Sequence, residues 1–176
     1  KLANYKQYKI ACLDTFWFGN YLSSKVKIIK ADMRNIEDKH IKGFDTVIHL
    51  AYLSNDPMCL LNGRETWESG PLAIYSILEK CKNNNVKHFI FASSGSVYGI
   101  KKEKKVTENL SLEPVSEYNK SKMIGERILL SYKKKIDLTI LRPATVCGYS
   151  PAMRLDVAIN ALTYSALKYD AITIFG

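Results

Sequence analysis

Residues 88–99 read HFIFASSGSVYG, and this stretch decides the fold. Its first half, His88–Ala92, is an apolar run of the kind that forms a buried strand. Its second half consists mainly of serine and glycine, which are typical of turns. A buried strand that ends in a small polar turn is where a parallel sheet places its ligand crevice. The stretch therefore predicts a sheet and, at its edge, a site.

Apolar runs and helical patterns alternate on both sides of this stretch. The other predicted strands are Lys9–Leu13, Val26–Ala31, Thr46–Leu50, Leu138–Arg142 and Ala171–Phe175. Predicted helices span Pro71–Lys82, with Pro71 as the first helical residue, about Glu117–Lys134, and Leu155–Tyr169. Such alternation is the signature of βαβ units, and near-continuous apolarity indicates that both faces of the sheet are covered. We predict an α/β fold with a doubly wound parallel sheet.

Composition narrows the class of protein. The 176 residues carry 26 Lys and Arg against 17 Asp and Glu, and 47% are hydrophobic. No apolar run approaches the roughly 20 residues needed to cross a bilayer, so no membrane association is expected. The basic residues are scattered rather than gathered on one face, which disfavours nucleic-acid binding. Four cysteines without short paired spacing indicate no metal site and a cytoplasmic location.

Tyr118 and Lys122 lie four residues apart near the start of a predicted helix. This spacing places both side chains on one face of the helix. An ammonium held near a phenol lowers the phenol's pKa, so the tyrosine can serve as an acid or base near neutral pH. The same helix carries a broad apolar stripe, which predicts its buried face. The stripe consists of Met123, Ile124, Ile128, Leu129 and Tyr132.

Together, the serine-rich turn and the Tyr118–Lys122 pair resemble the Ser, Tyr, Lys triad of the extended short-chain dehydrogenase/reductase family. The match is to its NAD-dependent nucleotide-sugar epimerase/dehydratase branch, which has a Rossmann-like fold. In that branch the catalytic Ser or Thr stands four positions before the Tyr of a Val-Tyr-Gly signature, here Tyr98. The resemblance therefore implies Ser94, Tyr118 and Lys122 as catalytic residues.

Other fragments match the family in the same order along the chain. The resemblance implies that Asp14 meets the adenosine ribose of NAD, and that Asp32 and Met33 lie beside the adenine. Leu50 and Ala51 belong to a His-Leu-Ala strand exit that passes the dinucleotide. Pro143 resembles the turn that flanks the nicotinamide, and Tyr118 and Lys122 also contact the cofactor in such enzymes.

The resemblance also implies a mechanism. Tyr118 would remove a proton from a sugar hydroxyl while NAD takes up the hydride. Lys122 would lower the pKa of Tyr118 and bind the nicotinamide ribose, and Ser94 would hold the sugar oxygen. Ser96 and Arg154 are further candidates for binding the nucleotide-sugar substrate, Arg154 through a phosphate.

One detail separates the branches of the family. The 4,6-dehydratases carry Asp-Glu directly after the catalytic Thr, whereas this chain has Gly95 and Ser96. An epimerase, or a related reductase, is therefore favoured over a dehydratase.

The nine glycines contain no Gly-x-Gly-x-x-Gly or Gly-x-x-Gly-x-x-Gly motif. We therefore expect a fold that is truncated at both ends, without the glycine-rich loop that binds the diphosphate. Residues 1–150 would be a partial NAD-binding domain and residues 151–176 the start of the substrate-binding region. Gly70 stands where the family usually carries an Asn near the cofactor. We expect these 176 residues alone to have little or no activity.

Two readings compete with the enzyme. The first is a non-catalytic NAD(P)-binding scaffold or sensor on the same fold, because fold does not determine function. The second is an RNA-binding protein that uses the basic surface. Retention of both Tyr118 and Lys122 favours the enzyme. Family enzymes often form homodimers through two helices per subunit, and the full-length parent is expected to do the same.

Overall fold

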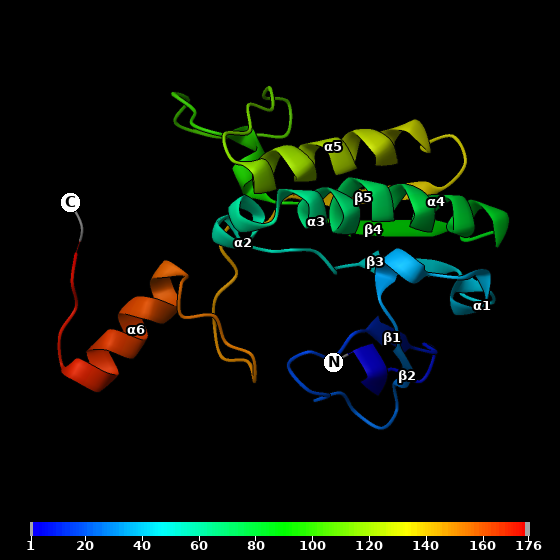
Figure 1. Ribbon diagram of the computed structural model, residues 1–176, viewed down its shortest axis with the longest axis horizontal. Helices are drawn as coiled ribbons and strands as arrows, with labels where there is room; N and C mark the ends of the chain where they lie inside the picture. The colour runs from blue at the N-terminus through cyan, green and yellow to red at the C-terminus, as the bar shows by residue number, and fades with distance from the viewer. Residues whose placement is uncertain (1, 175–176) are drawn as a thin grey trace. The chain divides into compact units, whose positions relative to one another are not determined.

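A computed structural model describes residues 2–174 (Figure 1). They form two compact units, a larger one reaching Thr15 and resuming over Ser23–Pro143, and a smaller one of Phe16–Leu22 and the residues from Ala144. The strands of the larger unit are β1 (Ala11–Asp14), β2 (Lys27–Lys30), β3 (Thr46–His49), β4 (His88–Ala92) and β5 (Asp137–Leu141). Its α-helices are α1 (Asp38–Ile41), α2 (Asp56–Leu61), α3 (Gly63–Trp67), α4 (Ala73–Asn83) and α5 (Glu117–Ser131). Short helical turns are η1 (Leu2–Asn4), η2 (Met33–Asn35), η3 (Glu68–Leu72) and η4 (Gly95–Tyr98), and the smaller unit contains α6 (Ala158–Tyr169).

The strands confirm the predicted parallel α/β architecture. β3, β4 and β5 form one parallel sheet in that order, with Ile90 of β4 opposite Ile48 of β3 and Thr139 of β5. β1 and β2 form a separate parallel pair. The observed bounds of these five strands lie within two residues of the predicted ones, because each strand is a local apolar run.

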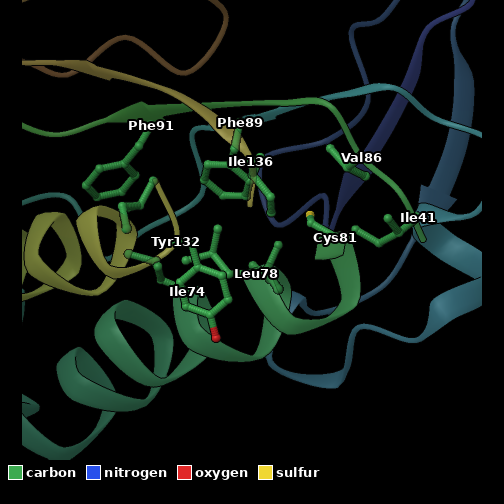
Figure 2. Close-up of a cluster of buried hydrophobic side chains, with 11 residues drawn as sticks. Ile41, Ile74, Leu78, Cys81, Val86, Phe89, Phe91, Tyr132 and Ile136 are labelled. Atoms are coloured by element: carbon green, nitrogen blue, oxygen red, sulfur yellow. The ribbon is translucent and has the colours of Figure 1, made fainter. Parts of the chain in front are cut away.

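Helices α4 and α5 cover one face of the three-stranded sheet (Figure 1). Phe89 and Phe91 of β4 are fully buried and point toward Ile74 and Leu78 of α4 (Figure 2). We predicted that both faces of the sheet are covered. The opposite face does not agree with this prediction, because Ile48 of β3 is 46% exposed. Within the larger unit, helices thus cover one face of this sheet and not both. Near-continuous apolarity shows that both faces of a strand can be buried. A neighbouring element must still cover each face.

The buried face of α5 agrees only in part with the predicted apolar stripe, because Leu129 and Tyr132 of that stripe are buried in the core. Its buried residues are Asn119, Ser121, Lys122, Gly125, Glu126 and Leu129, whereas Met123, Ile124 and Ile128 are only partly buried. Polar side chains occupy this face because other elements of the fold supply their partners. Periodicity of apolar residues does not report such partners.

Two predicted element positions were wrong. Residues 171–174 form no strand, and Phe175 lies outside the described residues. A strand needs a neighbouring strand for its backbone hydrogen bonds, and none pairs with residues 171–174. Helix α4 begins at Ala73, because Pro71 belongs to the π-helical turn η3, where Gly70 departs from helical backbone angles. No helix among residues 2–174 is long and apolar enough to cross a membrane.

Candidate active site

The first turn of α5 lies at the carboxyl end of β4. Ser116 caps the helix, because its Oγ accepts a hydrogen bond from the backbone N–H of Asn119 at 3.2 Å. Tyr118 is therefore in the first turn and Lys122 lies one turn later. The Nζ of Lys122 is 5.8 Å from the centre of the Tyr118 ring, so the helix brings the predicted pair together.

Lys122 is a buried cation at the end of the sheet. The residue is only 3% exposed. Its Nζ donates a hydrogen bond of 2.7 Å to the carbonyl oxygen of Ala92, the last residue of β4. The same ammonium lies 3.6 Å from the centre of the Tyr52 ring and 4.9 Å from that of Phe91. Burial lowers the pKa of Lys122 to about 7, because the charged form loses its hydration.

The serine-rich turn joins this helix through a chain of hydroxyl groups. Ser94 caps η4, and its Oγ lies 2.7 Å from the Oγ of Ser96. The hydroxyl of Ser96 donates to the side-chain oxygen of Asn119, the neighbour of Tyr118. The fold thus gathers Ser94, Ser96, Tyr118 and Lys122 at one edge of the sheet.

Pro143 follows β5 at the same edge. Its carbonyl oxygen accepts a hydrogen bond of 2.8 Å from the backbone N–H of Gly95. A Cβ on Gly95 would lie 3.1 Å from that oxygen, which is closer than most side chains approach. Gly95 therefore permits the turn that carries Ser94 and Ser96 to pack against the end of β5.

A partly buried ionic network lies at the same edge of the sheet, and sequence reasoning missed it. Glu126 of α5 is 1% exposed and binds Arg142 through two hydrogen bonds, Nε to Oε1 at 3.0 Å and Nη2 to Oε2 at 2.6 Å. Ser93 donates a third hydrogen bond to Glu126, and Arg142 donates one of 2.8 Å to the hydroxyl of Tyr98. The hydrogen bond to Glu126 raises the pKa of Arg142.

The network joins η4 and α5 to the residues that directly follow β4 and β5, because Tyr98, Glu126, Ser93 and Arg142 come from these four places. Its sequence signal was a charged residue directly after an apolar strand, Arg142, together with a glutamate one turn beyond Lys122. A buried carboxylate needs a partner, and arginine is the residue that satisfies it with two hydrogen bonds.

A cavity of about 410 Å³ in the larger unit is lined by residues of β1 and β3 and of the segments that follow β2 and β3. Four predicted cofactor residues line it, and these are Asp14, Met33, Leu50 and Ala51. His49 also lines the cavity, and its buried Nε2 has no hydrogen-bond partner within residues 2–174. Burial lowers the pKa of His49 to about 3, so its ring is neutral and has hydrogen-bonding capacity left over.

Asp32 follows β2 and caps η2. Its carboxylate accepts hydrogen bonds from the backbone and the side chain of Arg34, including one of 2.6 Å from Nη2. These bonds lower the pKa of Asp32. Its neighbour Ala31 donates a backbone hydrogen bond of 3.1 Å to Asp14, so the ends of β1 and β2 lie together. Asp32 is thus close to the cavity residues along the chain but does not itself line the cavity.

Arg154 belongs to the smaller unit. Its guanidinium binds the carboxylate of Asp156, with Nη2 2.6 Å from Oδ2. Its carbonyl oxygen accepts a hydrogen bond from Asn160, whose side-chain oxygen in turn accepts one from the backbone N–H of Gly148. These interactions join residues of the smaller unit. The larger unit brings Ser94, Tyr118 and Lys122 together, and Arg154 is not part of that unit.

The whole sequence, residues 1–176, matches a family model described as the NAD dependent epimerase/dehydratase family. A Bacillus subtilis protein described as an uncharacterized UDP-glucose epimerase is 34% identical over 155 residues, which are 86% of this chain and 47% of that protein. The UDP-glucose 4-epimerase of Lactobacillus helveticus is 28% identical over 152 residues, covering 80% of this chain and 45% of the enzyme. The chain spans about half the length of the curated relatives it matches.

Solved structures show the same fold. The UDP-N-acetylglucosamine 4-epimerase of Methanobrevibacter ruminantium M1 superposes with a TM-score of 0.84 at 26% identity, covering 96% of this chain and 58% of that one. The UDP-glucuronic acid 4-epimerase of Bacillus cereus, solved with UDP-glucuronic acid and NAD, gives 0.84 at 28% identity over 99% of this chain and 60% of that one. These likenesses confirm the predicted Rossmann-like fold.

Proposed function

The chain belongs to the NAD-dependent epimerase/dehydratase family, and on that premise we propose that it carries the proton-transfer residues of a nucleotide-sugar epimerase. One observation carries the proposal. The ammonium of Lys122 is held at the carboxyl end of β4 beside the ring of Tyr118. Ser94, which caps the start of η4, lies at the same edge of the sheet.

The side chains of the larger unit fit the nucleoside ends of NAD. The cavity between β1 and β3 offers apolar walls from Met33 and Leu50 and a carboxylate from Asp14, which suits an adenosine with ribose hydroxyls. Lys122 and Tyr118 offer a cation and a hydroxyl for the second ribose. We propose that these residues hold the cofactor. NAD, when bound, supplies the centre that takes up and returns a hydride.

In this proposal each polar residue at the edge has a separate task. Tyr118 accepts the proton of the sugar hydroxyl, and the nearby ammonium of Lys122 favours the phenolate form electrostatically. Ser94 donates a hydrogen bond to the same sugar oxygen and stabilises charge that develops on it. Ser96 donates its proton to Asn119, so Ser94 donates to Ser96 until the sugar oxygen replaces Ser96 as the acceptor.

Epimerisation is favoured over dehydration. Elimination of water needs an acid beside the catalytic hydroxyl, and η4 provides only the backbone of Gly95 and the hydroxyl of Ser96. The curated relatives named above carry epimerase names, which supports the same choice. We further propose a UDP-sugar as the substrate, because those relatives and the two solved structures bear the names of UDP-sugar enzymes.

The test uses the protein that carries residues 1–176 with UDP-glucose, UDP-N-acetylglucosamine and UDP-glucuronic acid, with the products separated by chromatography. We expect Tyr118→Phe to lower turnover at least about 100-fold, because the proton acceptor is lost, while NAD binding is retained. Tyr75→Phe is the control, since Tyr75 is an exposed tyrosine of α4. Normal turnover by Tyr118→Phe would remove Tyr118 from this role. Absence of turnover in the wild type would favour the non-catalytic NAD(P)-binding alternative.

A further inference from the structure

Lys122 is surrounded by groups from five parts of the chain, one of which is β4 with Phe91 and Ala92. Tyr118 and Glu126 approach it from α5, Cys59 from α2, His49 from β3, and Tyr52 from the segment after β3. A buried ammonium needs partners that replace water. The carbonyl of Ala92 provides one hydrogen bond, and the face of Tyr52 lies nearest among the aromatic rings, at 3.6 Å.

Tyr52 is itself held firmly against α5. Its hydroxyl donates a hydrogen bond of 3.1 Å to Ser121, whose hydroxyl donates one of 2.8 Å to the carbonyl oxygen of Tyr118. The rings of Tyr52 and Tyr118 meet edge to face, with centres 6.2 Å apart and planes at 80°. Tyr52 therefore contacts both members of the Tyr118–Lys122 pair.

Gly70 leaves the room that Tyr52 occupies. A Cβ on Gly70 would lie 2.8 Å from the Cζ of Tyr52 and closer still to its hydroxyl oxygen. Gly70 belongs to η3, which packs against α5 and whose buried residues are Ser69, Gly70 and Pro71. Any larger residue at position 70 would have to displace the Tyr52 ring from this position.

We propose that Tyr52 is a positioning residue, whose ring face holds the Lys122 ammonium beside Tyr118, and that Gly70 is the small residue this ring requires. The attraction between a cation and the negative face of an aromatic ring is strongest where water is excluded, as it is here. The positioning of Lys122 is independent of turnover, but its benefit to catalysis rests on the proposed function.

The direct test measures the titration of the Lys122 amine in this chain by NMR with ¹⁵N-labelled lysine, assigned with Lys122→Met. We expect Tyr52→Leu to lower the pKa of Lys122 by about one unit, because the charged form loses the ring face. Tyr52→Phe keeps the ring and is expected to titrate within about 0.3 unit of the wild type, since the quadrupole of the ring is retained. An unchanged or raised pKa in Tyr52→Leu would overturn the proposal.

A second variant keeps the proposal testable if Tyr52→Leu does not fold. Gly70→Ala displaces the ring without changing it, so it is also expected to lower the pKa of Lys122. Gly63→Ala is its control, because a Cβ on Gly63 meets nothing within 4 Å. In Tyr52→Leu/Gly70→Ala we expect no further decrease beyond that of Tyr52→Leu, since both changes act through one ring. Additive effects would contradict the coupling of Tyr52 and Gly70.

Turnover gives a separate readout in the protein that carries these residues. We expect Tyr52→Leu to lower kcat about 10-fold and to shift the pH profile of kcat, with partial recovery in Tyr52→Phe. If the wild type turns over but Tyr52→Leu matches it at every pH, the catalytic part of the inference is wrong. If the wild type has no turnover, the proposed function fails, while the NMR titration still decides whether Tyr52 positions Lys122.

Discussion

At the scale of single residues, the site contains two cations in opposite situations, the buried Lys122 and the partly buried Arg142. Arg142 is matched by the carboxylate of Glu126 and by the hydroxyl of Tyr98. Lys122 has a backbone carbonyl and aromatic faces, which stabilise its charge less well than a carboxylate does. Burial therefore lowers its pKa to about 7, because the charged form loses its hydration. An amine that titrates near neutral pH is suited to proton transfer, and it makes folding depend on pH.

The pH dependence of stability has a definite sign. In the unfolded chain Lys122 has an ordinary pKa near 10.4, so between about pH 7 and 10 the unfolded state binds more protons than the folded state. The free energy of unfolding of the wild type should therefore rise with pH in this window relative to that of Lys122→Met. We expect the difference to change by several kcal/mol at most, about 1.4 kcal/mol for each unit of pKa shift.

Urea unfolding at pH 7, 8 and 9 measures this difference for both proteins. Lys120→Met is the control, because Lys120 lies on the same helix and its ammonium is about half exposed. A constant difference between the wild type and Lys122→Met across the window would show that Lys122 keeps an ordinary pKa in the folded state.

At the scale of elements, α5 combines chemistry at its start with close packing in its middle. Gly125 lies between Lys122 and Leu129 on the buried face. A Cβ there would lie 2.8 Å from the Cδ1 of Ile74 and 3.4 Å from the Cζ of Phe91. The glycine thus lets α5 approach α4 and β4 closely enough for the Nζ of Lys122 to reach the carbonyl of Ala92.

We expect Gly125→Ala to reduce the free energy of unfolding by about 1 kcal/mol, because crowding in the core exceeds the gain in helix propensity. Ile74→Val removes the crowded methyl group. The double variant Gly125→Ala/Ile74→Val should therefore lose less free energy of unfolding than the two single variants lose when their losses are added. Urea unfolding of the four proteins measures this coupling. Gly63→Ala is the uncrowded control, and a stability gain in Gly125→Ala would contradict the close approach.

At the scale of the whole molecule, the five parallel strands of residues 2–174 are divided between two sheets. β1 and β2 lead to Asp14 and Asp32, and β3, β4 and β5 end at the edge where Ser94, Tyr118 and Lys122 lie. The cavity lined by β1 and β3 belongs to the larger unit. The two sheets therefore supply the residues proposed for the two ends of the dinucleotide, and the diphosphate between those ends needs hydrogen-bond donors of its own.

The 176 residues contain no glycine-rich turn that would offer backbone N–H groups to a diphosphate. We therefore expect residues 1–176 alone to bind NAD with a dissociation constant of about 1 mM or weaker in calorimetry. Adenosine is the control, because without donors for the diphosphate the two ligands should differ by less than about 10-fold. Micromolar binding of NAD would show that other residues of this chain hold the diphosphate.

Much of the larger unit could be predicted from local sequence. Five strands, the parallel arrangement and the helix that carries Tyr118 and Lys122 follow from apolar runs and four-residue spacing, which involve near neighbours only. The run at 171–174 is also apolar, but no strand among residues 2–174 pairs with it, so the same rule failed there. The tendency of a segment to form a strand is determined by its own residues. Its pairing with a neighbouring strand depends on another part of the chain.

What only the tertiary structure decided is the surroundings of the site. The sequence by itself determined the family and the elements that carry the candidate residues Ser94, Tyr118 and Lys122. It did not reveal that Tyr52 rests on Lys122, that Gly70 makes room for Tyr52, or that Glu126 meets Arg142. These contacts join residues from different elements, and a buried charge is stabilised by whichever groups the packed fold brings to it.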